Sequence, residues 1–134
     1  MEKRENKTAA VLEILTGIGL FLFWIGFFTV GLAPENPPPC YFAFEHSFPL
    51  PDMVLACLLL CAGVLVWRQN PKGRSLSLAG SGALVFLGLL DFSFNIQNKM
   101  YCISLADGIL NAFINIWCVG LGTFLFLTFF RRSA

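Results

Sequence analysis

The chain has 134 residues, of which 57% are hydrophobic and only 13% are charged. Soluble domains average about 45–50% apolar and about 25% charged residues. The composition therefore excludes a disordered chain, a nucleic-acid binder and an ordinary cytosolic enzyme, and it favours one small integral membrane domain.

Four apolar segments follow one another along the chain, and a helix needs about 20 apolar residues to cross the hydrocarbon core of a bilayer. These segments predict spans at residues 9–33, 52–68, 75–98 and 104–130. A tight polar turn built on Pro71 and Gly73 makes the second and third spans neighbours. We therefore expect a single-domain, all-α protein: an antiparallel bundle of four transmembrane helices.

The basic residues are distributed asymmetrically between the connecting segments. Eight of the nine Lys and Arg residues lie before the first span, between the second and third spans, or after the fourth span, and only Lys99 lies on the opposite side. Short loops rich in Lys and Arg stay in the cytoplasm. This pattern predicts a multi-pass protein of the cell (inner) membrane with both termini in the cytoplasm.

The predicted outer loop, residues 34–51, has an unusual composition. It holds six of the seven prolines, and its residues 40–48 are rich in aromatic side chains. Aromatic rings are favoured at the membrane–water interface. We expect this segment to lie at that interface or to fold over the mouth of the bundle.

Glycine pairs punctuate the predicted spans near their cytoplasmic ends. Gly17 and Gly19 belong to the first span, and Gly80 and Gly82 belong to the third. Small residues let helix backbones approach closely in lipid. We expect these four glycines to make the closest helix contacts, and we expect the outer half of the bundle to be wider.

Polar residues share one face on each of the last two spans. They are spaced at i, i+4 and i+7 on the third span (Asp91, Asn95, Asn98) and at i, i+4 and i+8 on the fourth (Asp107, Asn111, Asn115). Ionisable residues at membrane depth face the bundle interior and are functional hypotheses by default. We predict an outward-opening polar cleft built from Asp91, Asn95, Asp107 and Asn111, with Asp91 near Asp107.

Other interpretations apply to single members of this set. Ser104 and Asp107 fit a helix-capping pattern, and Asp52 after Pro51 is typical of a helix start. Asparagines in spans often bond only to neighbouring helices. Asp91 lies within a span between apolar residues, so a capping role does not explain it.

Glu45 and His46, in the aromatic outer loop, are further candidates for ligand contacts. His46 is the only histidine, and the carboxylates around it lack metal-ligand spacing. The sequence therefore indicates no metal site and no particular cofactor.

Two of the five cysteines, Cys40 and Cys102, fall in the two outer loops. Disulfides form in oxidising compartments, so a Cys40–Cys102 disulfide is a hypothesis. The chain has no C-x-x-C motif, which is the signature of thiol oxidoreductases.

Three functions are compatible with these patterns, and no catalytic signature favours an enzyme. The first is a membrane protein whose cleft binds a small molecule or a lipid. The second is a proton-coupled small transporter or channel that works as a dimer. The third is an accessory or structural subunit of a larger membrane complex. The partners expected are the lipid bilayer and either further copies of the chain or the subunits of a complex, without nucleic acid.

Overall fold

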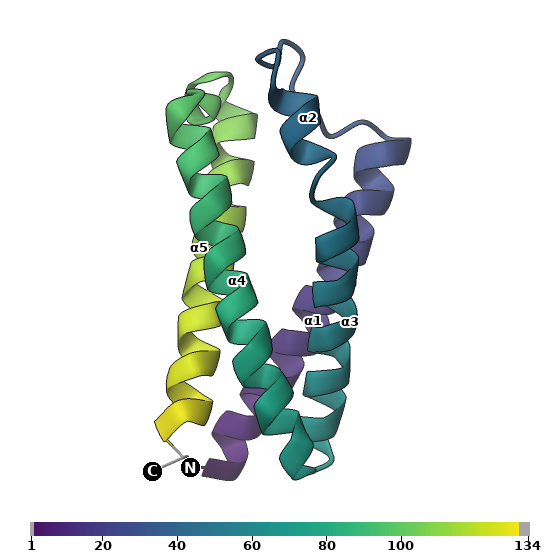
Figure 1. Cartoon of the computed structure of the whole chain (residues 1–134), viewed down its shortest axis with the longest axis vertical. Coiled ribbons are helices and arrows are strands. Elements are labelled where there is room, and N and C mark those ends of the chain that lie inside the picture. The colour runs from purple at the N-terminus through teal and green to yellow at the C-terminus, as the bar shows by residue number, and fades with distance from the viewer. Residues whose placement is uncertain (1, 132–134) are drawn as a thin grey trace.

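The computed structural model describes residues 2–131, and this part of the chain is helical (Figure 1). Its elements are α1 (Glu2–Thr29), α2 (Tyr41–Glu45), α3 (Pro49–Trp67), α4 (Pro71–Gln97), the short 3-10 helix η1 (Met100–Cys102) and α5 (Leu105–Phe130). Four helices are long and apolar enough to cross a membrane. This confirms the expected fold class at the level of four membrane-length helices and indicates a multi-pass membrane protein.

Local sequence signals explain where the long helices begin and end. The Asn70 side chain caps α4 by accepting a hydrogen bond from the Lys72 backbone N–H (3.0 Å), and Pro71 follows as the first helical residue. Ser104 caps α5 in the same way through the Asp107 N–H (3.1 Å). After α1, Gly31 adopts φ +83°, the left-handed conformation that terminates helices at low steric cost.

The long helices pack in the order α1, α3, α4, α5, each against the next, whereas α1 and α5 barely touch. The start of α1, the 68–70 turn between α3 and α4, and the end of α5 lie together at one end of the molecule (Figure 1). We call this the turn end. The opposite end, which we call the α2 end, holds α2 and η1 (Figure 1).

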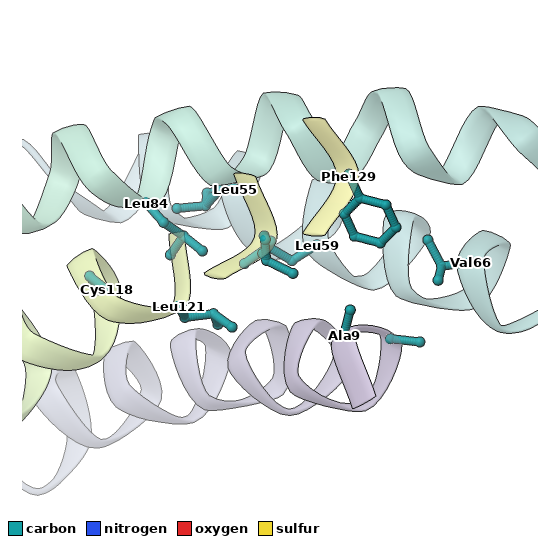
Figure 2. Close-up of a cluster of buried hydrophobic side chains, with 10 residues drawn as sticks. Ala9, Leu55, Leu59, Val66, Leu84, Cys118, Leu121 and Phe129 are labelled. Carbon is teal, nitrogen blue, oxygen red and sulfur yellow. The ribbon is translucent and has the colours of Figure 1, made fainter. Parts of the chain in front are cut away.

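Aliphatic side chains and glycines close the half of the molecule near the turn end. All four long helices contribute to its buried core (Figure 2), which consists of Ala9, Ala10, Leu55, Leu59, Val66, Leu84, Cys118, Leu121, Leu125 and Phe129. A Cβ atom at Gly122 would lie 2.8 Å from the Ser81 carbonyl oxygen, and one at Gly63 would lie 2.8 Å from the Ala10 carbonyl oxygen. The helix backbones therefore approach so closely that only glycine fits.

The glycine prediction is right for one member of each pair and wrong for the other. A Cβ atom at Gly17 would lie 2.8 Å from Leu60 Cγ, and one at Gly80 would lie 2.9 Å from Leu59 Cδ2. Nothing lies within 4 Å of the corresponding position at Gly19 or Gly82. The reason is the helical period, because residues two apart point to opposite sides of an α-helix.

The half near the α2 end has a different, aromatic core. It consists of Trp24, Phe27, Tyr41, Phe48 and Met100. Helix α2, which lies inside the predicted 34–51 loop, supplies Phe44, and this ring stacks on Phe94 of α4 at a centroid distance of 3.8 Å. The aromatic segment is therefore folded against the bundle rather than extended.

Candidate functional site

A cavity of about 410 Å³ lies along the sparse contact between α1 and α5. Helix α1 contributes Thr16, Gly19 and Trp24 to its wall, and α5 contributes a longer stretch between Asp107 and Cys118. The segment from Leu32 to Phe48 covers the cavity at the α2 end through some of its side chains. Cavities of this size accommodate small organic ligands.

Two tryptophans of the cavity wall make hydrogen bonds to neighbouring helices, one of them buried and the other part-buried. Trp24 Nε1 donates to Asp52 Oδ2 at 2.8 Å, which joins α1 to the first turn of α3. Trp117 Nε1 donates to Thr16 Oγ1 at 3.0 Å, which joins α5 to α1 where the two helices otherwise make little contact. Both tryptophans line the cavity.

Asp52, whose position after Pro51 is typical of a helix start, also belongs to the candidate site. It does lie in the first turn of α3, but its side chain makes no cap there, because it points toward Trp24. Asp52 is only 6% exposed and lines the cavity, and its Oδ1 atom has no hydrogen-bond partner within residues 2–131. A signal that could have pointed to Asp52 is the indole N–H of Trp24 in a predicted span, because a buried indole needs an acceptor.

Asp91 lies at the centre of a polar network between α4 and α5. Its Oδ2 atom accepts hydrogen bonds from Asn115 Nδ2 (2.5 Å) and Asn95 Nδ2 (3.3 Å). Asn95 Nδ2 also donates to Asn115 Oδ1 at 3.1 Å. The Tyr101 hydroxyl donates to the same Asn115 oxygen. Burial, together with the Asp91 charge, raises the pKa of Tyr101, so this hydroxyl keeps the proton that it donates.

The hydrogen bonds of Asp91 across the helix interface were not anticipated. We expected Asp91 near Asp107, and both line the cavity, but the helix register joins the Asp91 carboxylate by a hydrogen bond to Asn115, just as it sets Gly88 against Cys118. Asp107 lies two turns closer to the start of α5, where its carboxylate accepts a hydrogen bond from Ser104 Oγ (2.6 Å). The capping interpretation of Asp107 therefore describes its hydrogen bonds, although Asp107 also lines the cavity.

The remaining predicted site residues divide into two groups. Asn111 and Glu45, both half-buried, line the cavity together with Asp91 and Asp107. Asn95 is only 2% exposed and lies outside the cavity lining, where its side chain donates a hydrogen bond to Asp91. His46 is exposed, lies outside the lining and stacks on Phe28 at a centroid distance of 5.9 Å.

Cys40 and Cys102 are both exposed free thiols in this structure. The Cys40 thiol donates a weak hydrogen bond to Asn98 Oδ1 at 3.4 Å, so the segment before α2 lies against the end of α4. Their disulfide is not formed here and stays a prediction for the protein in an oxidising compartment.

A further carboxyl group, which is fully buried, lies away from the cavity lining. Glu13 of α1 is 0% exposed, and neither of its carboxyl oxygens has a hydrogen-bond partner in the described chain. Ser77 of α4, which is also fully buried and unpartnered, faces it. Close packing at Gly63 of α3, next to the Glu13 side chain, leaves this pair little room.

Within residues 2–131, no group of three or more His, Cys, Asp or Glu side chains is arranged to hold a metal ion. In comparisons with protein families, curated proteins and solved structures, no family, protein or structure matches this chain. The function proposed below therefore rests on the residues and geometry of the chain itself.

Proposed function

We propose that the chain is a multi-pass membrane protein that binds a small lipophilic molecule or a lipid in the cavity between α1 and α5. The observation that carries this proposal is a roomy, mainly apolar cavity whose wall includes Asp52, a buried residue with one carboxylate oxygen, Oδ1, that has no hydrogen-bond partner within the described residues. Buried polar atoms are almost always hydrogen-bonded. A buried carboxyl group of this kind in the wall of a cavity is typical of a site that a ligand completes.

The exposure of the cavity wall supports access from the membrane. Leu15 of α1 is 56% exposed and Phe113 of α5 is 61% exposed, and both line the cavity. They lie in the middle parts of the two helices that contact each other least. A lipophilic ligand therefore reaches the cavity sideways from the hydrocarbon core.

The polar network favours binding over an accessory-subunit role. An accessory subunit would leave its polar stripe to be satisfied by a partner chain, whereas Asp91, Asn95 and Asn115 satisfy one another within this chain. A transport role needs a route through the turn end, where glycine contacts bring the backbones together. Binding is the function that requires neither a partner nor a second route.

We also propose how the chain is oriented across the membrane. The four helices form an antiparallel bundle with the turn end and both termini in the cytoplasm, because Arg68, Lys72 and Arg74 flank the turn between α3 and α4. A single cysteine introduced at Ser133, in a variant whose native cysteines are replaced, should react with membrane-impermeant maleimide only after the cells are opened. Labelling of intact cells would contradict this orientation.

Binding itself is tested with a neutral lipophilic fluorophore and the protein in nanodiscs of zwitterionic lipid. We expect saturable binding that is lost in Gly19→Leu, because Gly19 lines the cavity and has open space in front of it. Gly82→Leu is the matched control, since Gly82 also has open space but lies outside the cavity lining. Absence of saturable binding, or equal binding by the two variants, would overturn the proposed function.

A further inference from the structure

The charged residues that line the cavity all carry the same sign. Four carboxyl groups contribute to its wall: Glu45 of α2, Asp52 of α3, Asp91 of α4 and Asp107 of α5. No Lys, Arg or His of the described chain belongs to the lining. Four different helices thus direct acidic groups into one space without a basic group to balance them.

Three of these carboxyl groups are close enough to repel one another. Glu45 interacts electrostatically with both Asp52 and Asp91, and Asp52 interacts with Asp91. The Trp24 N–H satisfies one oxygen of Asp52 and leaves Oδ1 without a partner in a residue that is 94% buried. Burying a charge without a counter-charge costs several kcal/mol, and a cation in the cavity supplies a counter-charge that offsets part of this cost.

Aromatic side chains also line this end of the cavity. Trp24, Tyr41 and Phe48 are buried and line the cavity beside the carboxyl groups. Aromatic faces attract cations, particularly organic ones with a diffuse charge. Together with the lack of a metal-binding cluster in residues 2–131, this favours an organic cation over a metal ion.

We propose that the cavity binds an amphiphilic organic cation. Its positively charged head lies against Asp52, Glu45 and Asp91, and its apolar body lies between α1 and α5 toward Thr16 and Trp117. The inference rests on the proposed function, because it names the ligand class of the same cavity.

The test compares two radiolabelled probes of the same shape. One is a long-chain alkyl trimethylammonium, whose charge does not depend on pH, and the other is its neutral isostere with carbon in place of nitrogen. Binding is measured with the protein in zwitterionic nanodiscs, after subtraction of the signal from protein-free nanodiscs. We expect the cation to bind at least about tenfold more tightly, which corresponds to about 1.4 kcal/mol.

Charge-removing variants then locate the effect. Asp52→Asn and Glu45→Gln should each lower the affinity for the cation severalfold while leaving the affinity for the neutral isostere within twofold. Glu35→Gln is the matched control, because Glu35 is exposed and lies outside the cavity lining, and it should change neither affinity.

The outcomes separate the two proposals. Equal affinity for both probes, with both lost in Gly19→Leu, would overturn the cation inference and leave the proposed function standing. A preference for the cation that survives both Asp52→Asn and Glu45→Gln would also overturn the inference. Saturable binding of neither probe would overturn both proposals.

Discussion

The half of the molecule near the turn end and the half near the α2 end each hold a carboxyl group between the helices, but they surround it differently. Glu13, in the first half, is packed against Gly63 and faces only the hydroxyl of Ser77. Asp91, in the second half, accepts hydrogen bonds from two asparagines and lines a cavity. The difference follows from what separates the helices.

In the first half, glycines bring the helix backbones together, and aliphatic side chains fill the remaining space. In the second half, bulky aromatic side chains and a polar network occupy the space between the helices. Small residues promote close contact in lipid, whereas bulky aromatic groups leave gaps between elements that a ligand can enter. The same four-helix frame thus provides a tightly packed base and a hollow upper part.

The largest effect that we expect concerns the hollow half. If Cys40 and Cys102 are oxidised, their disulfide closes a loop of about 60 residues. It should stabilise the fold by about 4 kcal/mol, because it lowers the conformational entropy of the unfolded chain. Intact-mass analysis with and without reductant detects the bond, and thermal unfolding under both conditions measures its effect. Free thiols in protein purified without reductant would contradict this prediction.

The next effect concerns the packed half. Gly122→Leu should destabilise the protein by about 3 kcal/mol, because a Cβ atom there would lie 2.7 Å from Val85 Cγ2 and 2.8 Å from the Ser81 carbonyl oxygen. Thermal unfolding in detergent measures this loss. Gly82→Leu, on a face with nothing within 4 Å, should unfold close to the wild-type temperature. If both variants lost the same stability, close packing would not be what distinguishes the two halves.

A smaller effect is expected in the polar network. Asn115→Leu should cost about 2 kcal/mol, because Asn95, Tyr101 and Asp91 each lose a hydrogen-bond partner. The control is Asn111→Leu, one turn away on the same helix, since Asn111 makes no side-chain hydrogen bond within residues 2–131. Chemical or thermal unfolding in detergent compares the two. Equal losses would mean that the network does not hold α4 and α5 together.

The smallest expected effect is an increase in stability, unlike the losses expected for Gly122→Leu and Asn115→Leu. Glu13→Met should stabilise the protein by about 1 kcal/mol, because it replaces an unpartnered buried carboxyl group with an apolar side chain of similar length. Thermal unfolding of Glu13→Met and of the exposed-site control Glu35→Met gives the comparison. A clear loss of stability in Glu13→Met, without a loss in Glu35→Met, would contradict this prediction. It would mean that the Glu13 carboxyl group stabilises the fold.

Composition and residue spacing were enough to predict the framework of this protein. Long apolar runs specify membrane-length helices because backbone groups in lipid must be hydrogen-bonded within the helix. Likewise, Asp91 and Asn95 share a helix face because residues four apart always do. Ser104 was recognisable as a cap from the residues that follow it. These features depend on neighbours in the sequence, so the sequence alone determined them.

The pairing across helices was decided only by the tertiary structure. Which residue of α5 lies opposite Asp91 depends on the length and shape of the connection, including the left-handed backbone of Lys99 (φ 54°) and the turn of η1. Asp52 meets Trp24 across 28 residues of chain because α2 and its flanking turns fold back over the bundle. Helical periodicity determines on which face of its helix a side chain lies, but not which other helix packs against that face. The cavity forms only where the faces of different helices come together.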